Sequence, residues 1–110
     1  MSSEFWYLAS PYSKYSDLDA AFNAACRVAA RLMGDGWPIY SPIVHMHPIA
    51  RYLDHDPRDS SFWVTLCAPM MRSAKGLIVA QLPGWEESDG IDAEIAYFRG
   101  ANKEILYVSG

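Results

Sequence analysis

Three residues near the end of the chain have types and a spacing that suit chemistry on a sugar. Ser88 stands two residues before Gly90, and Glu94 stands four residues after it. Positions four apart share one face of a helix, so glycine would leave open space above the carboxylate for a sugar ring. Ser88, close to the start of such a helix, would favour an anion such as a phosphate. On spacing alone, helix caps and a solvated surface acid remain an equally simple interpretation.

The histidines form a second candidate group. His45 and His47 are two residues apart, and on an extended segment they would point the same way, with Asp54, His55 and Asp56 following. That pattern makes a metal site conceivable, but no third ligand stands at an established spacing. We favour His45 or His47 at the rim of a ligand pocket, and we expect no metal and no cofactor.

The elements that must position these residues alternate between strand and helix. Four short apolar runs predict strands, at residues 5–9, 38–41, 76–82 and 104–108. Periodic apolar positions predict a helix from Leu18 to Leu32 with Ser16 as its N-cap, and further helices span residues 60–73 and 88–99. Residues 43–60 are predicted to be a long loop with one helical turn near residues 49–53. This alternation indicates one α/β domain over residues 1–110, with a parallel sheet of four or five strands.

In an open parallel sheet, ligands bind beyond the carboxyl ends of the strands. Three segments occupy that edge in the predicted arrangement: residues 9–14, 41–47 and 83–90. The candidate site residues of the first and third segments are Ser10, Pro11, Tyr12, Ser13, Trp85, Ser88 and Gly90. Tyr12 and Trp85 have rings that could stack on a base.

Composition limits the possible partners and location. The 110 residues carry a net charge of −4 and are 51% hydrophobic, which excludes a disordered chain and makes duplex nucleic acid an improbable partner. No apolar run approaches the roughly 20 residues of a membrane span, and no signal peptide is evident. Two cysteines without an evident disulfide suggest a reducing, cytoplasmic setting. Aromatic residues at 14% suggest a pocket or the interface of a homodimer or larger assembly.

Three segments together resemble the nucleoside 2-deoxyribosyltransferase superfamily. The stretch LPGWEESDGIDAE, residues 82–94, resembles its signature of Ser or Asp, one residue, Gly, three residues and Glu after an apolar strand. The stretch YLASPYS, residues 7–13, resembles its first strand and loop. The stretch SPIVHMHP, residues 41–48, with Trp63, is similar to a subgroup of small, poorly characterised bacterial and phage members.

This resemblance implies a flavodoxin-like three-layer sandwich and the cleavage or transfer of an N-glycosidic bond. The substrate would be a 2'-deoxynucleoside or its 5'-monophosphate, and Glu94 would be the nucleophile on the anomeric carbon. Tyr7 matches a tyrosine that orients this nucleophile. Serine at position 88 favours a 5'-phosphate, which Ser10 and Ser13 would help to bind, although the first loop carries Lys14 where an arginine is usual.

The resemblance also contains a departure. By alignment with the strand at residues 76–82, Cys67 stands where the superfamily has an aspartate that contacts the base or donates a proton. A thiol is a weaker acid than a carboxyl group, so Asp59, Asp89 or Asp92 would have to replace it. Two other functions therefore stay open: a nucleotide-binding domain without turnover, and a metal-dependent hydrolase built on His45 and His47.

Overall fold

The computed structural model describes residues 4–110 of the chain as one α/β fold. It contains four strands and four α-helices, which alternate except that α3 follows α2 directly, and one 3-10 helix before the last α-helix. In chain order they are β1 (Trp6–Ala9), α1 (Leu18–Gly34), β2 (Ile39–Tyr40), α2 (Pro42–Ala50), α3 (Ser60–Ser73), β3 (Gly76–Gln81), η1 (Trp85–Glu87), α4 (Asp89–Gly100) and β4 (Glu104–Ser109).

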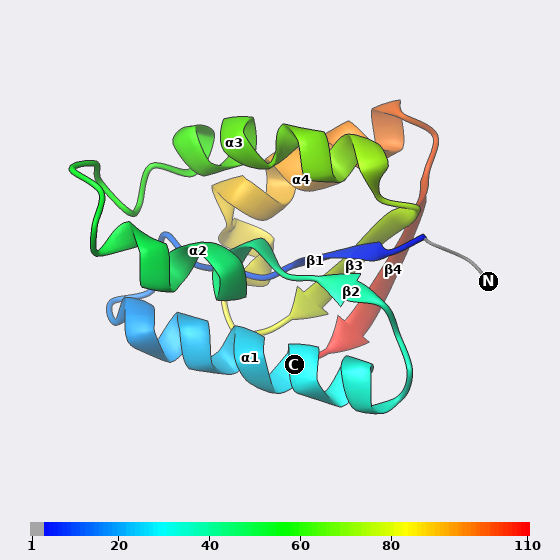
Figure 1. Ribbon diagram of the computed structural model, residues 1–110, viewed down its shortest axis with the longest axis horizontal. Helices are drawn as coiled ribbons and strands as arrows, with labels where there is room; N and C mark the ends of the chain where they lie inside the picture. Colours follow the sequence, from blue (N-terminus) through cyan, green and yellow to red (C-terminus); the bar gives the residue numbers. More distant parts are fainter. Residues whose placement is uncertain (1–3) are drawn as a thin grey trace.

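The four strands form one parallel sheet in the order β2-β1-β3-β4. Helix α1 covers one face of the sheet, and α3 and α4 lie together on the other (Figure 1). This arrangement confirms the predicted α/β class and the flavodoxin-like three-layer sandwich. The order of the strands reverses at β1, whose neighbours are β2 and β3, so the crevice of the fold opens beyond the carboxyl end of β1.

Alternation along β1 divides its side chains between two cores. Trp6 and Leu8 face α1 and pack with Val28, whereas Tyr7 and Ala9 face α3 and α4. Because both faces are covered by helices, all four residues of β1 are buried. Tyr7 is thereby held rigidly in the layer between the sheet and α4, where its ring packs against Phe98 at a centroid distance of 5.7 Å.

Helix α1 begins at Leu18, as predicted, but its N-cap is not the predicted residue. The N-cap is Asp17 and not Ser16, because the Asp17 carboxylate accepts hydrogen bonds from the backbone N–H groups of Asp19 and Ala20 at 2.9 and 3.4 Å. Helix α4 begins as predicted, with Ser88 as its N-cap accepting from the N–H of Ile91 at 3.2 Å.

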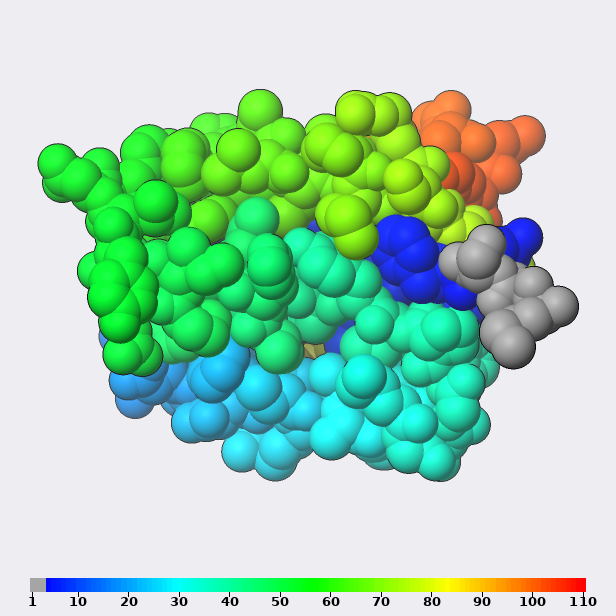
Figure 2. All heavy atoms as spheres, viewed as in Figure 1, coloured from blue at the N-terminus to red at the C-terminus, as the bar shows by residue number. Residues whose placement is uncertain are grey.

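Residues 42–50 form a helix, so the prediction of a loop from residue 43 is wrong. Pro42 stands at the first helical position, where a missing N–H costs nothing, and Ser41 accepts a hydrogen bond from Val44 N–H at 3.2 Å. The prolines and histidines resembled loop composition, but Pro42 starts the helix and does not break one. Helix α2 fills the space between α1 and α3 (Figure 2), and so covers the crevice beyond β1.

Helix α3 runs without interruption from Ser60 to Ser73, with Pro69 inside it. Its last turn is held by Lys103, whose ammonium group donates to the carbonyl oxygens of Met71, Arg72 and Ala74 at 3.1, 2.6 and 2.7 Å.

Cys26 and Cys67 are both free thiols. Among the described residues, no helix combines the length and apolar character needed to cross a bilayer.

Candidate functional site

A cavity lies at the crevice of the sheet, enclosed by the loop after β1 and by α2, α3 and the start of α4. Counting its open mouth, it contains about 560 Å³ of empty space, of which about 50 Å³ can be reached by the centre of a water-sized sphere. Its wall is mainly apolar. It brings together most of the residues predicted from sequence: Tyr7, Ser10, Tyr12, Ser13, His47, Cys67, Ser88, Gly90 and Glu94.

Glu94 contributes a carboxyl group to the wall of this cavity. It lies on α4 one turn after Gly90, and only 6% of its surface is exposed. Burial raises the pKa of its carboxyl group to about 8, while the adjacent Tyr7 hydroxyl acts in the opposite direction. No lysine or arginine is among the described residues that line the cavity, so no cation offsets this burial. Such an uncompensated buried acid in a cleft is typical of functional sites.

Two hydroxyl groups of the cavity wall are buried without a hydrogen-bond partner in the described part of the chain. They belong to Tyr7 and Ser10, on β1 and directly after it. Burial, followed by the charge of Glu94, raises the pKa of Tyr7, so its hydroxyl keeps its proton and remains a donor. Because an unpaired buried hydroxyl costs roughly 1–3 kcal/mol, these two groups are places on the cavity wall where a polar ligand or an ordered water would form hydrogen bonds.

Gly90 leaves the floor of the cavity open, as its spacing from Glu94 suggested. A Cβ atom added there would meet only the Cβ of Ser60 at 3.8 Å and the Oγ of Ser88 at 3.9 Å, which are ordinary contacts. The protein therefore has room for a side chain at this position, and the space belongs to the cavity.

A second hollow adjoins the cavity at Ser88 and Tyr12. Pro11 and Lys14 line this hollow, so Pro11 lies beside the predicted site and not in the main cavity. The Lys14 ammonium group donates to the carbonyl oxygen of Glu87 at 2.6 Å and lies 3.7 Å from the Asp89 carboxylate. The cation of the first loop is thus held next to the start of α4.

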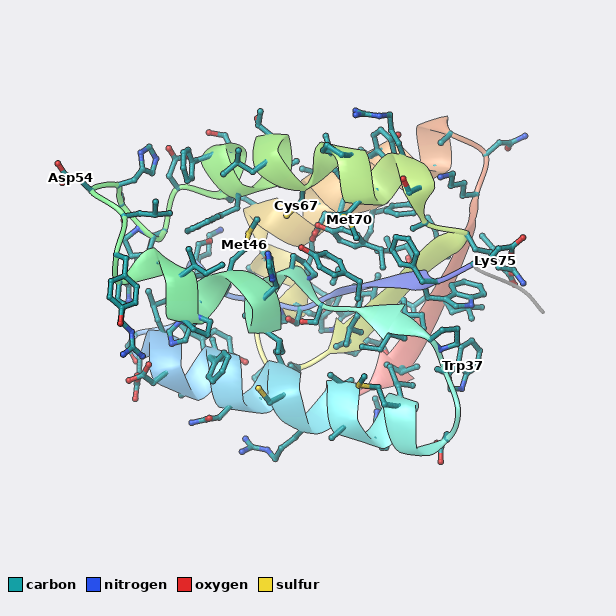
Figure 3. All side chains as sticks on the ribbon, viewed as in Figure 1. Trp37, Met46, Asp54, Cys67, Met70 and Lys75 are labelled. Atoms are coloured by element: carbon teal, nitrogen blue, oxygen red, sulfur yellow. The ribbon has the colours of Figure 1, made fainter. Side chains whose placement is uncertain are left out.

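Cys67 lies on α3 at the cavity wall with 2% of its surface exposed. Its thiol is 3.6 Å from the sulfur of Met46, and the two side chains point toward each other from α3 and α2 (Figure 3). Burial raises the pKa of this thiol to about 11, and the nearby Tyr7 hydroxyl only partly opposes that effect. Cys67 therefore has the expected place but is a very weak acid.

His47 is the centre of a hydrogen-bonded chain that the sequence did not reveal. Its Nδ1 is 2.7 Å from the hydroxyl oxygen of Tyr12, and its Nε2 is 2.7 Å from a carboxylate oxygen of Asp19. The Phe22 ring stacks on the imidazole at a centroid distance of 4.6 Å. The sequence does not predict this contact, because its pattern places His47 in a loop.

The two histidines do not form a pair. Residues two apart on a helix face in different directions, and α2 places His45 at the surface, with its ring 5.8 Å from that of Tyr40. His45 therefore lies outside the cavity. Among residues 4–110, no group of three or more His, Cys, Asp and Glu side chains is arranged to hold a metal ion.

Trp85 is also outside the cavity, because its ring packs against Tyr107 at 5.8 Å, beyond the sheet edge. The tryptophan of the cavity wall is Trp63 on α3, whose indole N–H donates to the carbonyl oxygen of Pro57 at 2.7 Å. A stacking role in the cavity is thus available to Trp63 and Tyr12 and not to Trp85.

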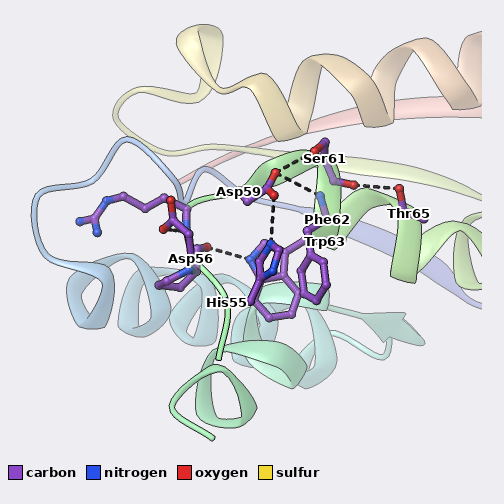
Figure 4. Close-up of polar contacts among 9 residues, drawn as sticks. His55, Asp56, Asp59, Ser61, Phe62, Trp63 and Thr65 are labelled. Atoms are coloured by element: carbon purple, nitrogen blue, oxygen red, sulfur yellow. Dashed lines mark hydrogen bonds and ion pairs between the residues drawn. The ribbon is translucent and has the colours of Figure 1, made fainter. Parts of the chain in front are cut away.

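None of the three aspartates considered as a replacement acid lines the cavity. Asp59 caps α3 and pairs with His55 at 3.0 Å (Figure 4), and hydrogen bonds, first from Ser61 and then from His55, lower its pKa to about 2. Asp89 pairs with Lys14, and Asp92 is exposed. None of these three carboxyl groups is therefore placed to replace the aspartate that the superfamily has at the position of Cys67.

The sequence matches, over residues 4–109, a family described as "Domain of unknown function (DUF1937)". No curated protein matches the chain. The basis for a functional assignment is therefore the chemistry of the cavity.

Proposed function

The chain belongs to the DUF1937 family, and we propose that it cleaves or transfers the N-glycosidic bond of a 2'-deoxynucleoside 5'-monophosphate or a deoxynucleoside. The observation that carries this proposal is the buried Glu94 carboxyl group, beside the unpaired Tyr7 hydroxyl in a cavity at the sheet crevice. The resemblance of residues 7–13, 41–48 and 82–94 to the nucleoside 2-deoxyribosyltransferase superfamily agrees with it.

The electrostatics of Glu94 suit glycosidic chemistry. Departure of a base leaves positive charge on the sugar, and a carboxylate stabilises that charge or forms a bond to the anomeric carbon. With a pKa of about 8, roughly a tenth of the free protein carries the carboxylate at pH 7. Because no lysine or arginine of the described cavity wall neutralises it, the carboxylate gains most when the cationic sugar forms. The Tyr7 hydroxyl would donate to the carboxylate and orient it.

The walls of the cavity divide into regions that fit the parts of a nucleotide. Gly90 leaves space for the sugar in front of Glu94. Trp63, Ile43 and Val64 supply an apolar surface for the base.

A phosphate would fit at the start of α4. The hydroxyls of Ser88, Ser10 and Ser13 line this cavity, and the first backbone N–H groups of α4 have no partner within the helix. The adjoining hollow holds Lys14 beside Ser88, so a phosphate placed between the two hollows would meet a positive charge. This arrangement supports a 5'-monophosphate over an unphosphorylated nucleoside.

The second candidate function is nucleotide binding without turnover. It is favoured by Cys67, a thiol with a pKa of about 11 where the superfamily has an aspartate. It leaves Glu94 without a purpose, because a binding protein gains nothing from burying a carboxyl group that costs stability.

The proposal is tested by incubating the protein with each 2'-deoxynucleoside and each 5'-monophosphate, with and without an acceptor base, and following free base by chromatography. Glu94→Gln keeps the size of the side chain and removes its charge, so it should abolish base release. Glu86→Gln, which changes an exposed acid of η1, is the matched control and should leave release unchanged. Ligand binding by the wild type without any base release would favour the second candidate.

A further inference from the structure

We infer that Tyr12, His47 and Asp19 form a proton relay from solvent to the cavity, which protonates the base as it leaves. The inference rests on the proposed glycosidic function. It supplies the acid that Cys67 does not. Burial raises the pKa of the Cys67 thiol and of the Tyr12 hydroxyl alike, but Tyr12 is hydrogen-bonded to His47, which can replace the proton that Tyr12 gives up, whereas the Cys67 sulfur faces Met46.

Exposure decreases steadily along the three residues of the relay. The Asp19 side chain is 82% exposed on α1, the His47 side chain is 14% exposed on α2, and Tyr12 is 7% exposed in the loop after β1. Both links are 2.7 Å long. Tyr12 and His47 line the cavity and also line a third hollow on its outer side, where Asp19 lies. The chain therefore connects bulk water to the cavity wall.

The direction of each hydrogen bond follows from the chemistry of the groups. The Asp19 carboxylate can only accept, so His47 donates to it from Nε2. When His47 is neutral, its Nδ1 accepts from the Tyr12 hydroxyl, and Tyr12 offers the cavity only an acceptor. When His47 is charged, Nδ1–H donates to Tyr12, and the phenolic proton is free to point at a ligand. The protonation state of His47 thus determines whether Tyr12 is an acid toward the cavity.

The resulting step balances in protons and electrons. The Glu94 carboxylate forms a bond to the anomeric carbon, and the electron pair of the C–N bond passes to the base nitrogen. That nitrogen takes the Tyr12 proton, while Tyr12 takes the Nδ1 proton of His47, which becomes neutral. Water then attacks the anomeric carbon and releases the Glu94 carboxylate. The proton that this water gives up returns through Tyr12 to His47, so the protein regains its starting state.

The surroundings of His47 contain charges of both signs. A carboxylate oxygen of Asp19 on α1 lies 2.7 Å from the imidazole Nε2. Arg51 at the end of α2 lines the outer hollow with His47, and the charge of Arg58, before α3, acts on Tyr12. On the cavity side, the ionisable groups that line the same cavity as His47 are Glu94 of α4, Cys67 of α3, Tyr7 of β1 and Tyr12. Asp19 is in direct contact with His47 and is therefore its positioning residue.

The test compares two substrates that differ in their need for an acid. One is the deoxynucleotide that the wild type cleaves best, and the other is an aryl 2-deoxyriboside whose nitrophenolate leaves without a proton. Tyr12→Phe keeps the ring and removes the hydroxyl, and His47→Gln keeps a polar side chain but cannot carry the proton. In both variants the rate of cleavage should fall about 10²–10⁴-fold for the nucleotide and far less for the aryl substrate. Tyr52→Phe, at an exposed tyrosine, is the control and should behave as wild type on both.

The dependence of rate on pH gives a readout that a structural role would not change. The wild type needs Glu94 ionised and His47 protonated, so its rate on the nucleotide should be bell-shaped. The pH profile of His47→Gln should lose its falling limb at high pH. Its rate should then rise to a plateau above pH 8, the region in which Glu94 ionises. Thermal melts of each variant show that the fold is intact.

The outcomes separate this inference from the proposed function. Equal losses on both substrates, or a bell-shaped profile that survives in folded His47→Gln, would overturn the relay and leave the glycosidic function standing. A wild type that cleaves neither substrate would overturn both. A selective loss on the nucleotide in a folded Tyr12→Phe supports the relay.

Discussion

The Glu94 carboxyl group lies beside the Tyr7 hydroxyl in the wall of the cavity, and the two groups shift each other's ionisation in opposite directions. The proximity of Glu94 helps to raise the pKa of Tyr7, whereas Tyr7 partly offsets the rise that burial causes in the pKa of Glu94. One residue comes from the first strand of the sheet and the other from its last helix. The fold therefore brings together an acid and a donor that are 87 positions apart in the sequence (94 − 7).

Glu94 should make stability depend on pH. Its folded pKa is about 8 and its ordinary value is 4.5, so between these values the folded chain binds more protons than the unfolded chain, and stability falls as pH rises. Full ionisation would cost on the order of 3–5 kcal/mol. We expect Glu94→Gln to be as stable as wild type near pH 4.5 and clearly more stable at pH 8.5, as measured by urea unfolding at both values. Equal stability of the two proteins at pH 8.5 would contradict the burial of an ionisable acid.

Replacing Tyr7 with phenylalanine should raise the pKa of Glu94 further. The tyrosine hydroxyl lowers the pKa of this carboxyl group, and its removal leaves burial unopposed. A carbon-13 NMR titration of the Glu94 carboxyl group should show ionisation near pH 8 in the wild type and at a higher pH in Tyr7→Phe. The exposed control Tyr52→Phe should leave the titration unchanged. A lower pKa in Tyr7→Phe would mean that the two groups do not interact as described.

Gly90→Ala should separate stability from activity. Alanine is favoured over glycine in helices by roughly 0.5–1 kcal/mol, and the nearest atoms to the added methyl group, at 3.8 and 3.9 Å, do not resist it. We expect a higher melting temperature together with a lower kcat/KM, because the methyl group occupies space in front of Glu94. Gly100→Ala, near the end of the same helix with nothing within 4 Å of the added atom, tests the helix effect alone. Full activity in Gly90→Ala would show that the sugar does not use this space.

Ser88→Asp should reveal whether the substrate carries a phosphate. Aspartate caps helices as well as serine does, so the start of α4 should be retained. Its negative charge would repel a phosphate at the start of α4, and kcat/KM should fall at least tenfold for a 5'-monophosphate but little for the nucleoside. Ser88→Asn, an uncharged cap of the same shape, separates charge from size. If Ser88→Asp lowers activity equally on both substrates, no phosphate is bound there.

The sequence predicted the elements with strong periodicity and the residues that stand directly after strands. Ser10, Ser88 and Glu94 reach one cavity because the carboxyl ends of parallel strands share an edge, a rule that needs no coordinates. The helix at residues 42–50 could not be predicted in this way, since its prolines and histidines have loop-like composition. Missing this helix placed His45 in the site, and it hid the contact of His47 with Asp19, 28 positions away. Trp63 was quoted only for its resemblance to relatives, because its position on the cavity wall depends on how α3 packs against α2.

The most direct test of the account measures release of free base from 2'-deoxynucleoside 5'-monophosphates by the wild type and by Glu94→Gln. We predict release by the wild type and its loss in a Glu94→Gln protein that remains folded and still binds the nucleotide. Base release that persists in Glu94→Gln would contradict the role of Glu94. A wild type that binds the nucleotides without releasing base would contradict the glycosidic function itself.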